Sequence, residues 1–386
     1  MNKIPTKKPG FNPNWQIKTL NEVCNKISAG GDKPDDCTTE KTEENQIPIF
    51  SNGIKNKGLC GYTKTPAITK PALTISARGT IGFACVRYEP FFPIVRLICV
   101  IPNEKLVVLE FLCYVLQYII PQGEGTSVPQ LTIPNFKKIE IPIPPLDEQK
   151  RIASALSKID AYLENTIKLI EEKERFKRGI AKKLLTCKEG ENIPEARFKG
   201  FEDEWEETQI LEFVNNNIIK IEKGKSITKS KIEEGDIPVI AGGKTPPYYH
   251  NKYNYNFPCI TISASGSAGY VWFHDYKIWA SDCHVIYTDN KRYNIKFLYH
   301  YLKNIQDLIY YLQVGGVQKH VYAKDLIKLN IPNITIEEQE KIGGYLSLLD
   351  EEIDNLKKQK ELIKEMKRGA MQKLLSGEVR LVDNYD

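Results

Sequence analysis

Long apolar segments, closely spaced cysteines and clustered histidines are all missing from this sequence of 386 residues. No run of about 18 apolar residues occurs, so the sequence predicts no membrane-spanning helix. The nine cysteines form no C-x-x-C pair, which argues against a disulfide framework and against a zinc site. The five histidines show no ligand spacing. The cysteine pattern favours a reducing cytoplasm. No apolar stretch follows the basic N-terminus, so we expect no signal peptide.

Catalytic motifs are also missing. GGKT at Gly242–Thr245 and GKS at Gly224–Ser226 both lack the first glycine that a phosphate-binding loop requires. TPPY at Thr245–Tyr248 resembles the Asp/Asn-Pro-Pro-Tyr motif of amino-group DNA methyltransferases, but threonine stands first and no glycine-rich cofactor loop precedes it. We therefore predict no catalytic residue, no metal site and no bound cofactor in this chain.

The bulk composition is that of a globular protein with more than one domain. The chain is too long for one ordinary core, and its apolar share of 41% and charged share of 27% are typical of globular proteins. The net charge of +5 is mild and is compatible with a nucleic-acid partner without requiring one.

An internal repeat dominates the sequence. LDEQKRIASALSKID, from Leu146, matches IEEQEKIGGYLSLLD, from Ile336, at an offset of 190. The same offset of 190 relates KRGIAKKLL, from Lys177, to KRGAMQKLL, from Lys367, and also relates Trp15 to Trp205. TISARGTIG, from Thr74, matches TISASGSAG, from Thr261, at an offset of 187. This period is too long for a solenoid, so the chain is a two-copy duplication.

Each copy has two parts. Residues 15–145 and 205–335 contain short apolar runs bounded by turn residues, with one amphipathic stretch, and predict a mixed α and β domain. The second part lacks proline and has apolar residues at heptad spacing, which predicts a helix of about 40 residues. These positions are Ile152, Leu156, Ile159, Leu163, Ile167 and Ile170, slightly out of register after Leu163, and Ile342, Leu346, Leu349, Ile353, Leu356 and Ile363.

The expected fold is therefore α+β, with two similar mixed α/β domains separated by two long antiparallel coiled-coil helices in a pseudo-twofold duplication. One long helix cannot bury its apolar stripe against a small domain, but two can bury it against each other. The expected boundaries are 1–146 and 191–335 for the domains, 147–190 and 336–378 for the helices with their linker, and 379–386 for a tail. The acidic residues in the first turn of each helix are expected to be stabilised by the helix dipole.

The loops of the two domains are the predicted binding elements. They combine glycine with short polar and basic side chains, which suit phosphate oxygens and base edges. The repeated segments outside the loops agree between the two copies, while the loops differ in sequence. This difference indicates that each copy recognises a different target. The candidate DNA-binding residues are Ser51, Asn52, Lys55, Arg78, Thr80, Ser127 and Gln130 in the first copy, and Lys244, Ser265, Ser267, Gln318, Lys319 and His320 in the second.

The sequence resembles the specificity subunit of type I DNA restriction-modification systems. The resemblance rests on the junctions IPIPPLDEQKRIASAL and IPNITIEEQEKIGGYL, on the long helices that follow them and end in KRG…KLL, and on the segments TISARGTIG and TISASGSAG. The resemblance covers nearly the whole chain. It implies two target recognition domains, each contacting one half of a bipartite double-stranded DNA site, and helices that set the unread spacer and dock two modification subunits.

The resemblance also implies that the chemistry belongs to other subunits. The modification subunits would carry S-adenosylmethionine and methylate adenine, and restriction subunits would cleave with ATP and Mg. Two alternatives remain from the residues alone. One is a two-headed architectural or regulatory DNA-binding protein that acts without a methyltransferase. The other is a stand-alone methyltransferase, against which the missing cofactor motifs argue.

Overall fold

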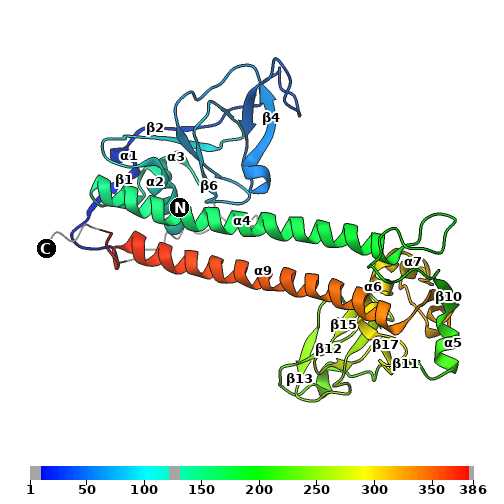
Figure 1. Ribbon diagram of the computed structural model, residues 1–386. Coiled ribbons are helices and arrows are strands. Elements are labelled where there is room, and N and C mark those ends of the chain that lie inside the picture. The colour runs from blue at the N-terminus through cyan, green and yellow to red at the C-terminus, as the bar shows by residue number, and fades with distance from the viewer. Residues whose placement is uncertain (1–9, 121–130, 382–386) are drawn as a thin grey trace. The chain divides into compact units, whose positions relative to one another are not determined.

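The computed structural model describes residues 10–120 and 131–381. The chain forms two compact units, and each long helix contributes to both (Figure 1). Unit 1 contains the chain up to Ile167 and again from Gln359, and unit 2 runs from Lys168 to Lys358. No helix among the described residues is long and apolar enough to cross a membrane.

Unit 1 contains three small sheets and short helices. Strands pair in the orders β2-β8-β5-β6, β4-β3-β7 and β1-β9. The elements are β1 (Gln16–Thr19), α1 (Leu20–Val23), β2 (Cys24–Ala29), β3 (Ile47–Phe50), the 3-10 turn η1 (Lys55–Gly58), β4 (Leu59–Thr63), β5 (Ala72–Ile75), β6 (Ala84–Arg87), β7 (Phe92–Pro93), β8 (Ile98–Pro102), α2 (Leu109–Ile119), α3 (Ile133–Lys137), β9 (Glu140–Ile143) and the start of α4 (Leu146–Leu185).

Unit 2 repeats this arrangement. Its strands pair in the orders β11-β17-β14-β15, β13-β12-β16 and β10-β18. The elements are β10 (Glu206–Gln209), α5 (Ile210–Asn215), β11 (Ile219–Lys223), η2 (Lys229–Lys231), β12 (Ile237–Ile240), β13 (Tyr248–His250), β14 (Cys259–Ser263), β15 (Val271–His274), β16 (Trp279–Ala280), β17 (Cys283–Thr288), α6 (Ile295–Asn304), α7 (Gln306–Tyr311), α8 (Ala323–Leu326), β18 (Asn330–Asn333) and the start of α9 (Ile336–Ser376).

The two sets of sheets correspond strand by strand. In each copy the sheet with four strands is antiparallel throughout, and the sheet with three strands contains one parallel pair. This agreement confirms the predicted duplication and the mixed α and β content of each domain.

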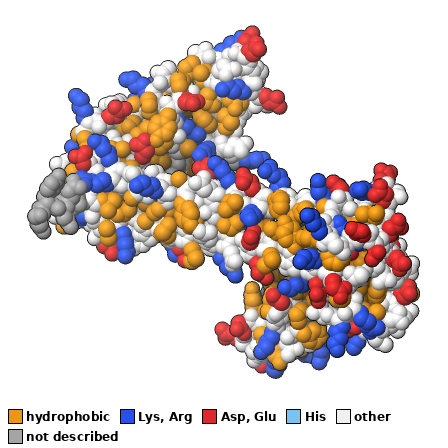
Figure 2. All heavy atoms as spheres, in the orientation of Figure 1, with side chains coloured by type: hydrophobic (Ala, Val, Ile, Leu, Met, Phe, Trp, Pro, Cys, Tyr) orange, Lys and Arg blue, Asp and Glu red, His pale blue; other side chains and the backbone are white. Residues whose placement is uncertain are grey.

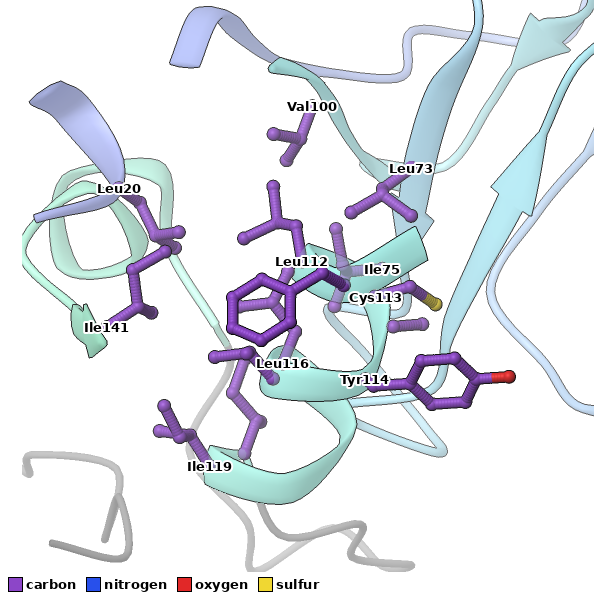
Figure 3. Packing of buried hydrophobic residues seen from close by; sticks show 14 of the residues in the cluster. Leu20, Leu73, Ile75, Val100, Leu112, Cys113, Tyr114, Leu116, Ile119 and Ile141 are labelled. Atoms are coloured by element: carbon purple, nitrogen blue, oxygen red, sulfur yellow. The ribbon is translucent and has the colours of Figure 1, made fainter. Parts of the chain in front are cut away.

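The core of each domain includes residues from a long helix. In unit 1, Leu112 and Leu116 of α2 pack toward Leu73 and Ile75 of β5, and all four side chains are fully buried (Figure 3). The first turns of α4 join the same core, as do Leu374 and Leu375 near the end of α9. Unit 2 builds its core in the same way, from the start of α9 and the end of α4. Burial of these leucines is what fixes the ends of the long helices onto the domains.

The long helices α4 and α9 run antiparallel within each unit. In unit 1, Lys367 of α9 lies 2.6 Å from Asp160 of α4. In unit 2 the equivalent residues, each 190 positions away, pair as Lys177 and Asp350. The beginning of one helix therefore lies against the end of the other in both units. The predicted antiparallel helix pair is confirmed.

One position of the predicted apolar stripe was wrong. Ile167 is 37% exposed, while Thr166 is buried, although the heptad count had placed Ile167 inside. The Thr166 hydroxyl donates to the Tyr162 carbonyl within α4, at 2.9 Å, and so satisfies its own polar group. A threonine bonded to the preceding turn can replace an apolar residue in the stripe, and the apolar pattern therefore slips by one residue after Leu163.

The repeated glutamine of the helix start joins α4 and α9 to their domains. In unit 1, the Gln149 side chain accepts from the Val108 amide at 2.8 Å and donates to the Leu106 carbonyl at 3.1 Å. In unit 2, Gln339 accepts from the Asn294 amide at 2.8 Å. Val108 and Asn294 are the residues just before α2 and α6, so each glutamine caps the domain helix and fixes its position on the long helix.

The repeated glutamate of the same motif is a buried ion-pair partner, whereas the sequence predicted only an acidic cluster in the first turn. Glu148 is only 1% exposed, and its two oxygens accept from Arg380, at 2.5 and 2.6 Å. This pairing raises the pKa of Arg380. The ion pair ties the segment after α9 to the start of α4.

Candidate nucleic-acid interface

Asn52 holds three loops of unit 1 together. Its side-chain oxygen accepts from the Ala77 amide, and its side-chain nitrogen donates to the Val95 carbonyl, both at 2.7 Å. The Gly53 amide adds a bond of 3.3 Å to the Ser76 hydroxyl. The loops after β3, β5 and β7 therefore gather at one place. Because both ends of its amide bind backbone, Asn52 holds these loops in position, while its second N–H and second oxygen lone pair are not used in these two bonds.

The buried Arg87 contacts the loop after β3 and stabilises it. The Arg87 guanidinium lies 3.6 Å from the centre of the Phe50 ring, donates to the Thr74 hydroxyl at 3.1 Å, and also donates to the Lys57 carbonyl. Burial lowers the pKa of Arg87. Lys57 has a positive φ of 52°, so the turn η1 adopts a strained backbone that this contact stabilises. Sequence reasoning missed Arg87, since no motif marks a lone strand-end arginine.

The other predicted residues of the first copy lie on the same loops. Lys55 and Arg78 are exposed, whereas Ser51 and Thr80 are half-buried. Lys55 begins η1, and Arg78 lies next to Ala77, whose amide Asn52 binds. Ser127 and Gln130 lie outside the described residues. The structure thus brings the described candidates of this copy into one loop cluster.

In unit 2 two glycine-rich loops replace the asparagine clamp. The Ser267 amide donates to the Gly242 carbonyl at 2.6 Å. A Cβ atom on Gly242 would lie 2.6 Å from the Ser265 carbonyl oxygen, so only glycine permits this approach. The Ser265 hydroxyl donates to the Asp282 carboxylate. Asp282, which sequence reasoning missed, therefore orients Ser265 within the cluster.

A short hairpin completes the cluster in unit 2. Val314 and His320 exchange two backbone hydrogen bonds of 2.8 and 2.9 Å, and the loop between them contains Gln318 and Lys319, both exposed. The Gln313 side chain donates to the Ala268 carbonyl at 2.7 Å, which ties the hairpin to the Ser263–Gly269 loop. His320, Gln318 and Lys319 thus stand beside the two serines predicted from the other loop.

Lysines and aromatic rings accompany the loops of unit 2. Lys244 is exposed, and its ammonium lies 5.6 Å from the centre of the Tyr270 ring. Lys229 lies 5.9 Å from the Tyr248 ring in the same way. The face shown in Figure 2 has Lys and Arg side chains interspersed with acidic ones, so positive charge is concentrated in small groups rather than in one field. Such groups suit individual phosphates.

The buried histidines of unit 2 do not form a metal site. Within the described ranges, no three His, Cys, Asp or Glu side chains come close enough together to hold a metal ion. His274 bonds Thr261 at 2.8 Å, and burial lowers its pKa to about 3, so it is a neutral core residue. Thr74 and Arg87 make the corresponding contact in unit 1.

Comparison with known proteins also finds two copies of one domain in this chain. The family model of the type I restriction modification DNA specificity domain matches twice, at residues 12–172 and 202–365. A protein of Methanocaldococcus jannaschii described as the specificity subunit of a type I restriction enzyme is 30% identical over 72% of this chain and 70% of its own. A Mycoplasma pneumoniae protein described as a type I specificity subunit is 36% identical over 39% of this chain.

The extent of these matches differs. The chain spans 45% of the length of the Mycoplasma pneumoniae relative. The crystal structure of a type I restriction-modification S subunit from M. genitalium has a TM-score of 0.69, with 20% identity, over 96% of this chain and 99% of that one. At this identity the match shows that the two chains share a fold.

Proposed function

Because the chain belongs to the family of type I restriction-modification DNA specificity proteins, we propose that it is the non-catalytic, sequence-specific DNA-binding subunit of such a complex. One observation carries this proposal. The same domain occurs twice, with matching sheets, and each copy presents a differently built loop cluster. An asparagine organises the first cluster, and close-packed glycines organise the second.

Each domain would read one half of a bipartite double-stranded DNA target. Backbone amides, hydroxyls and the exposed Lys55, Arg78 and Lys244 can bind phosphates, while polar tips such as Gln318 can reach base edges. Because the clusters differ in residues and in construction, the two half-sites would differ in sequence. The continuous helices α4 and α9 would set the spacer between them.

The chemistry would belong to the partners. Two modification subunits would dock on the long helices and supply S-adenosylmethionine, and restriction subunits would supply ATP-dependent cleavage with Mg. The complex would act in the cytoplasm, and the nine free cysteines of the chain agree with a reducing compartment.

Affinity purification separates this function from that of a two-headed regulator acting alone. The tagged full chain, expressed in its host, should co-purify with a methyltransferase, and native mass spectrometry should show two methyltransferase subunits for each copy of this chain. Purified chain alone should neither methylate nor cleave DNA. Recovery of specific DNA binding without any methyltransferase partner would favour the regulator.

Exchange of one domain tests the two-reader arrangement. Residues 15–145 are replaced by those of a relative, and methylated adenines are mapped in host DNA. One half of the target should change and the other half should stay. A change in both halves would contradict separate readers.

A further inference from the structure

Unit 2 contains a basic pocket between the end of α4 and helix α6. Its volume is about 480 Å³, and four of its eight lining residues are Lys or Arg, while none is acidic. Lys177, Arg178 and Lys182 come from α4, and Lys303 comes from α6. His300 also lines the pocket, but burial and the nearby Lys177 and Lys296 lower its pKa to about 3, so it adds no charge.

Most of this positive charge is not neutralised within the described part of the chain. Lys177 pairs with Asp350, but Arg178, Lys182 and Lys303 have no ion-pair partner there. The Lys303 ammonium donates only to neutral oxygens, the Val271 carbonyl and the Gln306 side chain, both at 3.3 Å. Burial lowers the pKa of Lys303, and the nearby Lys177 and Lys244 lower it further, while Asp350 acts in the opposite direction. A bound anion would relieve this repulsion.

The pocket is linked to the loop cluster through one tyrosine. The Lys303 ammonium lies 4.2 Å from the centre of the Tyr270 ring, and that of Lys244 lies 5.6 Å from the same ring. The Gln306 side chain donates to the Gly269 carbonyl at 2.7 Å, at the end of the Ser263–Gly269 loop. Positive charge therefore continues from α4, past Tyr270, to the loops proposed to read DNA.

Unit 1 keeps Lys367 and Arg368 at the places of Lys177 and Arg178 but lacks the other two lysines of the pocket, although its backbone is equivalent. Gln117 donates to the Ala84 carbonyl at 3.1 Å, just as Lys303 donates to the Val271 carbonyl, so the two positions correspond. At the offset of 190, Lys182 is replaced by Gln372, and Lys244 by Ile54.

The lysine that bonds an aspartate of the other helix is common to both copies, as Lys177 and Lys367. The additional lysines of unit 2 are thus not required by the shared fold. Their positive charge is specific to the second copy, which points to a ligand that only this copy binds.

We propose that this pocket binds a phosphate group of the DNA backbone beside the half-site read by unit 2. The inference rests on the DNA-binding function proposed above. Ammonium and guanidinium groups with few internal partners are what backbone phosphates bind, and the link to Lys244 places the phosphate next to the reading loops. The first half-site would lack an equivalent contact, because unit 1 has glutamines at these places.

The test exchanges residues between copies. Lys182→Gln and Lys303→Gln, alone and together, introduce the residues that unit 1 carries at the same positions, so the fold accommodates them. Lys291→Gln, on the exposed turn after β17, is the matched control for loss of one charge. The full chain, with the subunits that co-purify with it, binds a duplex containing its target at roughly 50 to 300 mM KCl, a range over which phosphate contacts change affinity steeply. The double variant should lower the slope of log affinity against log salt by about one, and the control should not.

A neutral phosphate analogue locates the contact. Methylphosphonates are placed one at a time along the duplex beside the second half-site. At one position, a methylphosphonate should weaken DNA binding by the wild-type chain by the same factor as the double substitution weakens binding to the unmodified duplex. At that same position it should not weaken binding by the double variant any further. Additive loss at every position would overturn the proposal.

Two further arms distinguish a free-anion site and a failure of DNA recognition from the proposed backbone contact. Inorganic phosphate, added at constant ionic strength, tests for a free-anion site. If it stabilises the wild type but not the variant while the DNA salt slope is unchanged, the pocket binds a small anion and the proposal is wrong. If the wild type does not distinguish its target from scrambled DNA, the proposed function and this inference both fall. If the wild type does distinguish its target from scrambled DNA but the double variant keeps the wild-type slope of log affinity against log salt, only the proposal for the pocket is overturned.

Discussion

Arg197 and Glu338 form a two-point ion pair in unit 2, with guanidinium nitrogens 2.7 and 2.8 Å from the two carboxylate oxygens. Glu338 is 2% exposed, and the contact raises the pKa of Arg197. Glu338 also accepts from the Trp205 indole at 3.4 Å. Arg380 and Glu148 repeat the pair in unit 1, although the arginines are not at the repeat offset. Each long helix therefore begins on a buried carboxylate that is neutralised by an arginine from outside the helices, in the linker for Glu338 and in the segment after α9 for Glu148.

Removing Arg197 should destabilise unit 2 strongly. Arg197→Ala leaves the Glu338 carboxylate buried without its partner, which costs about 3 to 5 kcal/mol. The measurement is urea unfolding followed by tryptophan fluorescence. Lys199→Ala, in the same linker, is the control and should change stability by less than about 0.5 kcal/mol. Adding Glu338→Gln to Arg197→Ala should recover part of the loss. A cost below about 1 kcal/mol for Arg197→Ala would show that the carboxylate does not need this partner.

Mild acid should destabilise unit 2 before unit 1. All five histidines lie between residues 250 and 320, in unit 2. Burial lowers the pKa of His274 and of His300 to about 3, below the value near 6.5 of an unfolded chain. Below about pH 6.5 the unfolded state binds protons that the folded state excludes, so stability is lost as pH falls, by up to about 2 kcal/mol per histidine at about pH 5.

The tryptophans separate the two units in this experiment. Trp15 is the one tryptophan of unit 1, and Trp205, Trp272 and Trp279 lie in unit 2. Urea unfolding at neutral pH and at about pH 5, with Trp15→Phe as the variant that reports unit 2 alone, measures the loss. His274→Gln should reduce the pH dependence of that variant. Equal loss in both units between these pH values would contradict a role for the histidines.

Charge removal at Lys55 and Arg78 should identify the type of contact that each makes. Loss of a phosphate contact weakens binding to target and scrambled DNA equally and lowers the salt slope by about one. Loss of a base contact weakens target binding alone, by about 1 to 3 kcal/mol. Lys55→Ala and Arg78→Ala are compared with Lys41→Ala, an exposed lysine elsewhere in unit 1, by fluorescence anisotropy. Unchanged binding in both variants would remove this loop cluster from the DNA-binding surface.

Lengthening both long helices should change the spacer of the target. Seven residues are inserted between Ile167 and Lys168 of α4, and seven between Lys358 and Gln359 of α9, which keeps the heptad register and adds roughly 10 Å to each. At about 3.4 Å per base pair, the preferred spacer should grow by up to about three base pairs. The accompanying rotation, on the order of 100°, could instead abolish binding.

Selection from a random library measures the new spacer, and insertion into α4 alone is the control, because it breaks the match between the helices. The half-site sequences should stay the same, since the loops are untouched. Full activity on the original spacer would show that the helices do not measure DNA.

The sequence by itself determined the duplication, the mixed domains and the long helices. Helices with heptad repeats and strands bounded by turns follow local periodicity, which a sequence displays directly. The position of most loop candidates followed from composition, because glycine and short polar residues accumulate where the backbone turns. The pattern misplaced Ile167, since apolar periodicity cannot register that Thr166 satisfies its own hydroxyl and enters the stripe.

Only the tertiary structure decided which side chains support the loops and which remain available. Asn52 and Ser265 carry the residue types of a binding site, and in the structure their side chains also bond the Ala77 amide, the Val95 carbonyl and the Asp282 carboxylate. The ion pairs of Glu148 and Glu338 and the contacts of Lys303 join residues far apart in the chain. Such pairings depend on how strands and helices pack, and distances across a packed fold leave no periodic trace in a single sequence.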